Sequence, residues 1–148
     1  ETTANVGSFI APGAKNIVCD KAQLIFEARS LDNAKLKKQT DTMKQALQDA
    51  AQRHGGRVEI QHEHLYEVYH HHHDSPVLAT FRQACTKLGF PYREEPTLGG
   101  SDANILNELG IPTLVCSIGY EEAHTTSEYI PIEELERLLS LVLELVTL

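Results

Sequence analysis

The alternation of apolar and polar positions predicts three strands in the first half of the chain. They are expected over Thr2–Ile10, Asn16–Ala28 and Arg57–Tyr69, where β-branched and aromatic residues are frequent. Ala11–Gly13 supplies turn residues between the first two strands, which we therefore expect to form a hairpin.

A helix is expected between the second and third of these strands. Its apolar positions recur at helical spacing, at Leu36, Met43, Leu47 and Ala50. Ser30 and Asp32 offer oxygens to the first turn, and Gly55–Gly56 ends the helix, because glycine takes the left-handed conformation without steric cost. The order strand, strand, helix, strand (β-β-α-β) predicts an incomplete ferredoxin-like α+β unit that lacks the opening strand and helix of the complete sandwich.

The second half of the chain reads differently, as helices around one buried strand. Three helices are expected to begin at Ser75–Pro76, at Ser101 or Asp102, and at Pro131. Thr113–Ile118 is a continuous apolar run, typical of a strand covered on both faces. We therefore expect an α/β layer over residues 76–148, a separate α+β domain over residues 1–70, and a hinge over residues 71–75.

Charge and composition exclude several classes of partner. The formal net charge of −8 argues against nucleic acid and anionic membranes, because both repel an acidic surface. No run approaches the roughly 20 apolar residues that span a bilayer, and no signal-peptide pattern opens the chain. The cysteines are far apart, at Cys19, Cys85 and Cys116, which predicts reduced thiols in a cytoplasmic protein. Since the chain begins at Glu1 rather than Met, we expect a fragment or a processed product.

Two polar segments could carry chemistry. The loop Gly119–Thr126, which contains His124, follows the predicted buried strand, and ligands of open α/β sheets bind at that edge. A single histidine in such a loop can equally be ordinary surface. The segment Gly99–Asn104 is a glycine loop before a helix N-terminus, which suits a carboxylate or another anion, but a tight turn with a cap explains it as well.

Histidines are concentrated at the predicted hinge. His70–His73 are consecutive, so only residues two apart on a strand could share one ion. The run is interpreted as a solvated hinge, with an adventitious metal site and a functional metal site as alternatives. His62 and His64 share a strand face and could join such a site, or could be surface histidines.

Several motifs, in this order along the chain, resemble one family. The segments N-x-V-x-D at Asn16–Asp20 and E-A-R-S at Glu27–Ser30 are followed by GGSDAN, GIPT and AHTTSEYIPIEEL. Together they are similar to the C-terminal part of the peptidase T-like dizinc exopeptidases, whose relatives include glutamate carboxypeptidases and aminoacylases. The resemblance covers essentially the whole chain: part of the lid, or dimerisation, domain and then the end of the catalytic domain.

The resemblance implies roles for five residues. His124 matches the last ligand of a pair of zinc ions. Arg29 and Asn16 match lid residues that reach the substrate, Arg29 through a carboxylate and Asn16 near the scissile carbonyl. Gly99 and Gly100 match a loop whose backbone lines the substrate pocket. Local pairing of Arg29 with its acidic neighbours, and a turn at Asn16, are the alternatives.

The rest of that metal site has no counterpart in the sequence. In the family, the other ligands, the bridging Asp and the general-base Glu lie in a preceding N-terminal half. We therefore expect no catalytic residue here, weak or partial zinc binding at most, and no peptide hydrolysis by this chain alone.

For the parent protein, the resemblance implies a cytoplasmic tripeptidase-like aminopeptidase that acts on short peptides and forms a homodimer through its lid strands. An aminoacylase-like or carboxypeptidase-like amidohydrolase is the alternative enzyme, and a non-catalytic dimerisation module is the alternative from another class.

Overall fold

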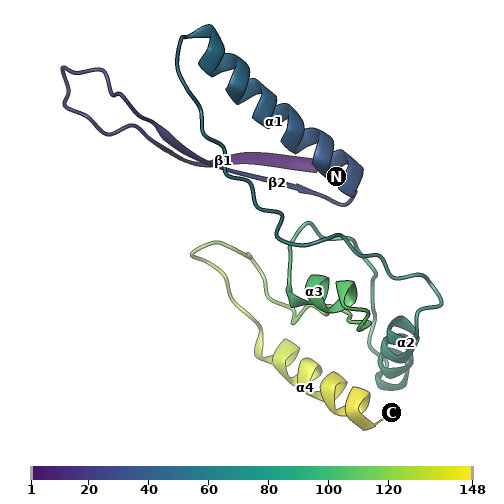
Figure 1. Ribbon diagram of the computed structural model, residues 1–148. Coiled ribbons are helices and arrows are strands. Elements are labelled where there is room, and N and C mark those ends of the chain that lie inside the picture. Colours follow the sequence, from purple (N-terminus) through teal and green to yellow (C-terminus); the bar gives the residue numbers. More distant parts are fainter. Residues whose placement is uncertain (1, 148) are drawn as a thin grey trace. The chain divides into compact units, whose positions relative to one another are not determined.

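The computed structural model describes residues 2–147 and divides them into two compact units. The first unit runs to Val68 and includes Pro96–Gly99, and the second comprises Tyr69–Glu95 and the chain from Gly100 onward. Each is described by itself. Figure 1 labels the elements of both, and no helix among the described residues is long and apolar enough to cross a membrane.

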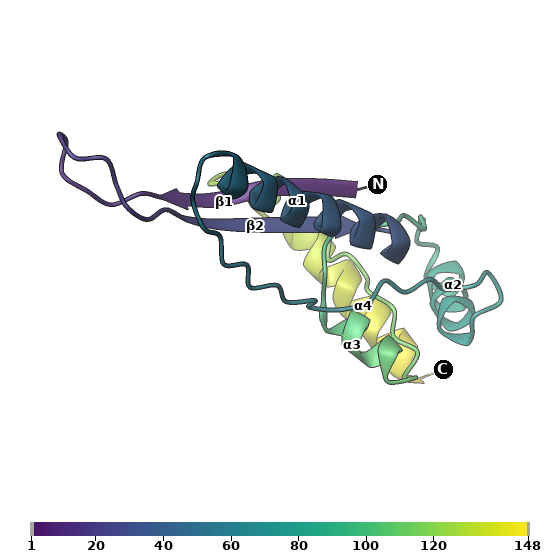
Figure 2. The same ribbon diagram turned by 45° about the horizontal axis from the view of Figure 1, so that its top comes forward.

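The first unit is an antiparallel hairpin with a long helix packed on it. Strand β1 (Thr2–Ile10) pairs with β2 (Gln23–Ser30), with a bulge between Val6 and Ser8. Half-buried residues alternate with exposed ones along β2, so that one face is covered, and helix α1 (Asn33–Arg53) packs against both strands (Figure 2). Glu27 and Arg29 lie on the opposite face of the strand, because side chains two residues apart share a face.

The ends of α1 follow the predicted signals. Asp32 is the N-cap, and its Oδ1 accepts the N–H groups of Ala34 and Lys35 over 2.8 and 3.0 Å. After the last turn, Gly55 takes a φ of 69°, where a side chain would be strained. The predicted helix and both of its boundary signals are therefore confirmed.

Two of the three predicted strands need correction. The second begins at Gln23 rather than Asn16, because residues 11–22 form an irregular connection that contains a turn from Ala14 to Ile17. The third, expected over Arg57–Tyr69, belongs to no ladder among residues 2–147. An apolar extended pattern becomes a strand only where a neighbouring strand supplies hydrogen-bond partners, and the sheet here is limited to β1 and β2.

The second unit is built from three helices. They are α2 (Pro76–Leu88), α3 (Asp102–Glu108) and α4 (Ile132–Thr147). The core lies between α2 and α4, where Ala84, Cys85 and Leu141 are buried with Phe81 and Leu145 against them. The predicted starts at Ser75–Pro76, Ser101 and Pro131 are confirmed.

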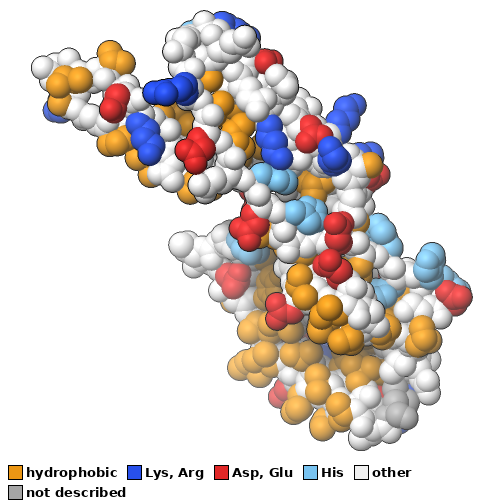
Figure 3. All heavy atoms as spheres, viewed as in Figure 1, with side chains coloured by type: hydrophobic (Ala, Val, Ile, Leu, Met, Phe, Trp, Pro, Cys, Tyr) orange, Lys and Arg blue, Asp and Glu red, His pale blue; other side chains and the backbone are white. Residues whose placement is uncertain are grey.

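The predicted buried strand over Thr113–Ile118 has no strand partner among the described residues, and it is half-buried at Thr113, Leu114 and Cys116 rather than covered on both faces. Val115 and Ile118 are 50% and 41% exposed, and much of the surface around α4 is apolar (Figure 3). The side-chain amide of Asn107 takes the place of a strand neighbour at one residue. It donates to the carbonyl of Thr113 over 2.8 Å, and its Oδ1 accepts the Thr113 N–H over 3.2 Å.

One member of the histidine run has a structural contact. Nε2 of His71 lies 2.9 Å from the same Thr113 carbonyl, and its ring meets Tyr69 edge to face. His70, His72 and His73 are exposed. Of the pair His62 and His64, Nε2 of His64 lies 3.1 Å from Oε1 of Glu67. His71 therefore anchors the extended segment, and the proposed metal roles of the run stay predictions.

Candidate functional site

The loop that carries His124 is closed at its base by a backbone bridge. The N–H of Glu121 donates to the carbonyl of Tyr129 over 2.8 Å, and the N–H of Tyr129 donates to the carbonyl of Glu121 over 3.3 Å. This pair of hydrogen bonds joins the two arms of the loop without a sheet. The ends of the intervening turn are therefore fixed.

Within that turn, Thr125 ties the chain to itself. Its N–H and its hydroxyl both donate to the carbonyl of Glu122, over 3.2 and 2.8 Å. Its Oγ1 also accepts the N–H of Ser127 over 3.1 Å, and its carbonyl accepts the N–H of Glu128 over 3.3 Å. Loops of this kind are held by their own polar groups rather than by a core.

The backbone of His124 is left-handed. Its φ is 62°, and that of Glu122 is 52°; among residues 2–147 these are the non-glycine residues with positive φ. The conformation costs an L-residue about 1–2 kcal/mol, so surrounding contacts must hold it. One such contact is direct: the N–H of His124 donates to Oε2 of Glu128 over 2.8 Å. Hydrogen bonds to ionised acceptors are among the stronger ones, so this bond offsets part of the strain.

The imidazole of His124, in contrast, is free. It is exposed and makes no hydrogen bond or ion pair with any residue that the structure describes. A ring whose backbone is fixed and whose nitrogens are uncommitted is well suited to bind a metal ion, since a neutral imidazole nitrogen is a common ligand.

The start of the loop requires glycine. Gly119 has a φ of 79°, and a Cβ there would lie 2.8 Å from Cβ and Cγ of Glu134 on α4. Glu134 in turn accepts a 2.7 Å hydrogen bond from Arg137. The backbone at the end of the extended segment therefore packs closely on the first turn of α4.

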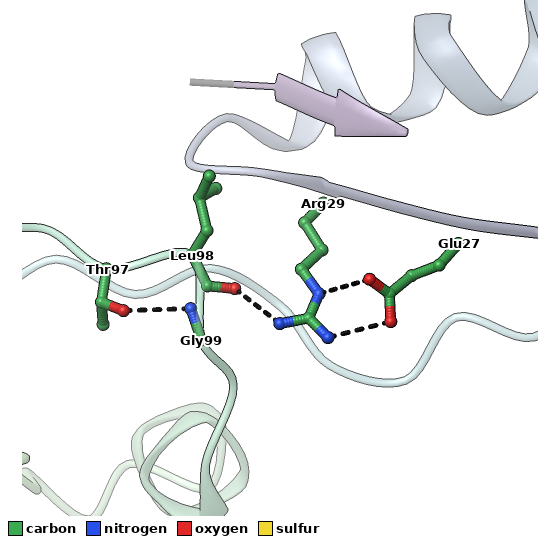
Figure 4. A network of polar contacts seen from close by, with 5 residues as sticks. All are labelled: Glu27, Arg29, Thr97, Leu98 and Gly99. Carbon is green, nitrogen blue, oxygen red and sulfur yellow. Dashed lines mark hydrogen bonds and ion pairs between the residues drawn. The ribbon is translucent and has the colours of Figure 1, made fainter. Parts of the chain in front are cut away.

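Arg29 is engaged with its neighbour on β2 (Figure 4). Its Nε and Nη2 donate to Oε1 and Oε2 of Glu27 over 2.7 and 2.9 Å, a bidentate pair, and Nη1 contacts the carbonyl of Leu98 over 3.4 Å. The Arg29 guanidinium lowers the pKa of Glu27, chiefly through these hydrogen bonds. Because the two side chains are 41% and 55% exposed, the pair is solvent-screened and contributes little to stability.

The predicted glycine loop lies beside this arginine at one end. The N–H of Gly99 donates to Oγ1 of Thr97 over 3.0 Å, in the segment whose Leu98 carbonyl contacts Arg29 (Figure 4). Gly100 is exposed and belongs to the second unit. At the start of α3, Ser101 donates its N–H to Asn104 and caps the N–H of Ala103, so these backbone donors are already bonded.

Asn16 lies far from Arg29 within the first unit. It occupies the turn of the β1–β2 connection, where Ile17 donates to the carbonyl of Ala14 over 3.1 Å, and it is exposed. Arg29 is near the opposite end of β2, about 20 Å along the strand from the residue at which the connection joins it. The first unit thus brings Arg29 and Gly99 together but not Asn16, and the roles of all five residues toward a substrate or metal stay predictions.

The sequence interpretation missed two residues that shape the loop, Glu128 and Gly119. Glu128 was part of the quoted motif, and its position four residues after His124 is a usable signal because a short turn returns a carboxylate to the preceding backbone. Gly119 gave no signal, since its constraint comes from the distant Glu134.

Comparison with known proteins identifies the family. Residues 2–148 match Peptidase family M20/M25/M40 along essentially the entire chain. This chain belongs to that family. YqjE of Bacillus subtilis, an uncharacterized protein, is 39% identical over 146 residues, which are 99% of this chain and 39% of YqjE. Peptidase T of an Exiguobacterium species is 26% identical over 152 residues, 97% of this chain and 36% of the relative.

Two solved structures of M20-type peptidases share the fold. Aminopeptidase PepT from Bacillus cereus matches 98% of this chain and 39% of its own, with a TM-score of 0.82 and 39% identity. A tripeptidase from Staphylococcus aureus matches 97% of this chain and 39% of its own, with a TM-score of 0.88 and 37% identity. The peptidase T-like resemblance and the mixed α and β fold class are confirmed, and the chain spans about two fifths of the length of these relatives.

Peptidases of the M20 family are generally metal-dependent. Among residues 2–147, however, no group of three or more His, Cys, Asp or Glu side chains could hold a metal ion. Protein zinc sites use three or four protein ligands, and His124 stands alone. The described residues therefore do not fit a metal centre by themselves.

Proposed function

We propose that the complete protein containing this chain removes N-terminal residues from short peptides, as a tripeptidase-like aminopeptidase. The observation that carries this proposal is the likeness to the Staphylococcus aureus tripeptidase, with a TM-score of 0.88 at 37% identity over 97% of the chain. Identity at this level over both units supports a shared activity as well as a shared fold.

The proposal includes a pair of zinc ions, as the motif resemblance implies. His124 would contribute one ligand, and the remaining ligands, the bridging carboxylate and the general base would come from residues outside this chain. The isolated imidazole and the partial coverage of the relatives support this division. We assign no catalytic step to the described residues, and we propose that this chain alone is inactive.

Arg29, Gly99, Gly100 and Asn16 are proposed to bind the substrate. For Arg29 the support is chemical: its planar fork already holds a carboxylate in bidentate geometry, and that carboxylate is the exposed Glu27. A substrate carboxylate could replace Glu27 at small cost, because solvent-exposed ion pairs are weak.

Turnover by the complete protein tests the activity. Purified zinc-loaded protein should hydrolyse unmodified tripeptides and leave N-acyl amino acids intact. Preferential hydrolysis of N-acyl amino acids would instead establish the aminoacylase-like alternative. The three free cysteines are consistent with a cytoplasmic location, which we also propose.

A homodimer through the hairpin is a second proposal, and exposed apolar residues favour it. Val6, Phe9 and Ile10 of β1 and Ile25 of β2 are each more than half exposed, on a sheet whose two strands have no further strand beside them among residues 2–147. Phe9→Glu should convert a dimer to a monomer in size-exclusion chromatography with light scattering. Val18→Glu, in the exposed connection, is the matched control; a dimer that survives Phe9→Glu would contradict this interface.

A further inference from the structure

A single peptide group connects Arg29 to the hydroxyl of Thr97 (Figure 4). The carbonyl of Leu98 and the N–H of Gly99 belong to the same trans peptide group, so they point in opposite directions. At one end, the Gly99 N–H donates to Oγ1 of Thr97 over 3.0 Å. At the other end, the Leu98 carbonyl accepts from Nη1 of Arg29 over 3.4 Å. The Thr97 hydroxyl therefore favours the orientation of the peptide group that turns its carbonyl toward Arg29.

The turn that contains this peptide group is held by polar contacts. Thr97 and Gly99 are exposed and Leu98 is half-buried, and Pro96–Gly99 belongs to the same compact unit as Arg29. A Cβ added to Gly99 would lie only 3.3 Å from Oγ1 of Thr97, so glycine lets the hydroxyl approach closely. A threonine hydroxyl that bonds the backbone two residues on is a common way to fix a short turn.

The guanidinium of Arg29 uses separate nitrogens for its two partners. Nε and Nη2 donate to the carboxylate of Glu27 over 2.7 and 2.9 Å, whereas Nη1 contacts the Leu98 carbonyl. Another carboxylate could therefore replace that of Glu27 without displacing the carbonyl. Because the guanidinium is planar, the contact at Nη1 also restricts the plane in which Nε and Nη2 lie. The Leu98 carbonyl can thus hold the guanidinium while its carboxylate partner changes.

We propose that Thr97 is a positioning residue for carboxylate binding, because its hydroxyl orients the Arg29 guanidinium through the peptide group of Leu98 and Gly99. The inference rests on the proposed function, in which Arg29 binds the carboxylate of a short peptide. Glu27 stands in for that carboxylate in the structure. Thr97 acts only through the backbone, since its Oγ1 accepts the Gly99 N–H.

Two substitutions separate the hydroxyl from the shape of the side chain. Thr97→Val replaces the hydroxyl by a methyl group of similar size and so removes the acceptor. Thr97→Ser keeps a hydroxyl at the same reach, so it should still accept the Gly99 N–H. Thr42→Val is the matched control, because Thr42 lies in the same unit, is exposed, and donates its hydroxyl to a carbonyl within α1.

Steady-state kinetics of the complete protein give the first readout. We expect Thr97→Val to raise KM for an unmodified tripeptide about three- to tenfold, the effect of one ordinary hydrogen bond, and to change kcat less than about twofold. KM for the C-terminal amide of the same peptide should not rise, because the amide offers no carboxylate to Arg29. Thr97→Ser and Thr42→Val should both stay within about twofold of wild type. A wild-type KM in Thr97→Val, an equal rise in Thr97→Ser, or an equal rise for acid and amide would overturn the proposal.

A double-mutant cycle separates this inference from the function on which it rests. In an Arg29→Ala background, Thr97→Val should have no further effect on KM, because Thr97 acts through Arg29. The same rise with and without Arg29 would contradict that route. If Arg29→Ala leaves KM unchanged, carboxylate binding by Arg29 fails, and the inference fails with it. If Arg29→Ala raises KM and Thr97→Val does not, only the positioning role fails.

A second readout needs no substrate. Hydrogen exchange followed by NMR should show the Gly99 amide protected in the wild-type protein, because its N–H is bonded to Oγ1 of Thr97. Thr97→Ser should keep that protection and Thr97→Val should remove it. Unprotected exchange at Gly99 in the wild-type protein, or protection that survives Thr97→Val, would show that the hydroxyl does not hold the peptide group.

Discussion

The strand that carries Arg29 and the loop that carries His124 hold their key side chains in opposite ways. Arg29 has ordinary strand backbone, but its guanidinium is bound by Glu27 and contacts the carbonyl of Leu98. His124 has a strained backbone held by Glu128, but its imidazole is free. The difference suits the two proposed roles: a metal ligand gains from a fixed direction, whereas a substrate-binding arginine must exchange one carboxylate for another.

The largest effect on activity is expected from substitution of His124, whose imidazole has no partner among residues 2–147. His124→Ala in the complete protein should lower kcat/KM for a tripeptide by about a thousandfold, because a bound metal contributes several kcal/mol to transition-state stabilisation. Steady-state kinetics with measured zinc content test this. A kcat/KM close to that of the wild-type protein would show that His124 is not a ligand of the metal site.

The next largest effect is expected from substitution of Arg29, whose guanidinium is paired with Glu27. Arg29→Ala should raise KM for a tripeptide about 10- to 100-fold, since charged hydrogen bonds to the substrate are lost. Arg29→Lys should rescue little, because an ammonium group lacks the planar fork. The C-terminal amide of the same peptide is the control for the carboxylate, and an equal KM change for acid and amide would show that Arg29 does not bind that group.

A pair of glycines tests how rigidly the loop is placed. Gly119→Ala must meet both a positive φ and the Glu134 side chain at 2.8 Å, whereas Gly110→Ala meets a φ of 79° with nothing within 4 Å. Gly119→Ala should therefore lower the free energy of unfolding by about 1–3 kcal/mol more than Gly110→Ala, as overpacked sites do. Equal losses in urea denaturation would mean that α4 does not constrain the loop.

Loss of the ion pair between Glu27 and Arg29 should have a small effect on KM, opposite in sign to that of Arg29→Ala. Glu27→Gln removes the internal carboxylate and leaves Arg29 available, so KM for a tripeptide should fall about two- to fivefold, in keeping with the weakness of exposed ion pairs. Asp20→Asn, in the same unit and outside β2, is the charge-matched control. A rise in KM with Glu27→Gln would show that Glu27 supports Arg29 rather than competing with the substrate.

The smallest effect is a titration. Because Arg29 lowers the pKa of Glu27 from its ordinary value of 4.5, the pair stabilises the folded state fully above that value. Its contribution is lost as the pH falls through the lowered, folded-state pKa. Carboxyl NMR titration should show a Glu27 pKa below the ordinary value in wild type and a return toward it in Arg29→Ala. An ordinary pKa in both would mean that the pair does not form in solution.

The sequence was informative wherever a local signal decides the structure. Helices α1, α2 and α3 begin where expected, at Asp32, Pro76 and Ser101, because capping residues act on the N–H groups of the next few residues. The ordered motifs also predicted the family, which the match over residues 2–148 confirms.

Predictions failed where structure depends on distant partners. Residues 57–69 and 113–118 have strand-like composition, but a strand also needs a neighbour, and neither segment has one among residues 2–147. The pairing of Arg29 with Glu27 was predicted as an alternative, whereas the hydrogen bond from the His124 N–H to Glu128 was not. A side chain that holds a strained backbone leaves only a weak trace in sequence, because many residues would be compatible with the same loop length.

Zinc binding by the 148-residue chain alone tests the central claim most directly. Equilibrium dialysis against zinc, followed by elemental analysis, should show no stoichiometric tight site, and residual binding should be unchanged by His124→Ala, since a single imidazole is insufficient. The complete protein should retain two zinc ions under the same conditions. Two tightly bound ions in the chain alone, or tripeptide hydrolysis by it, would contradict the account.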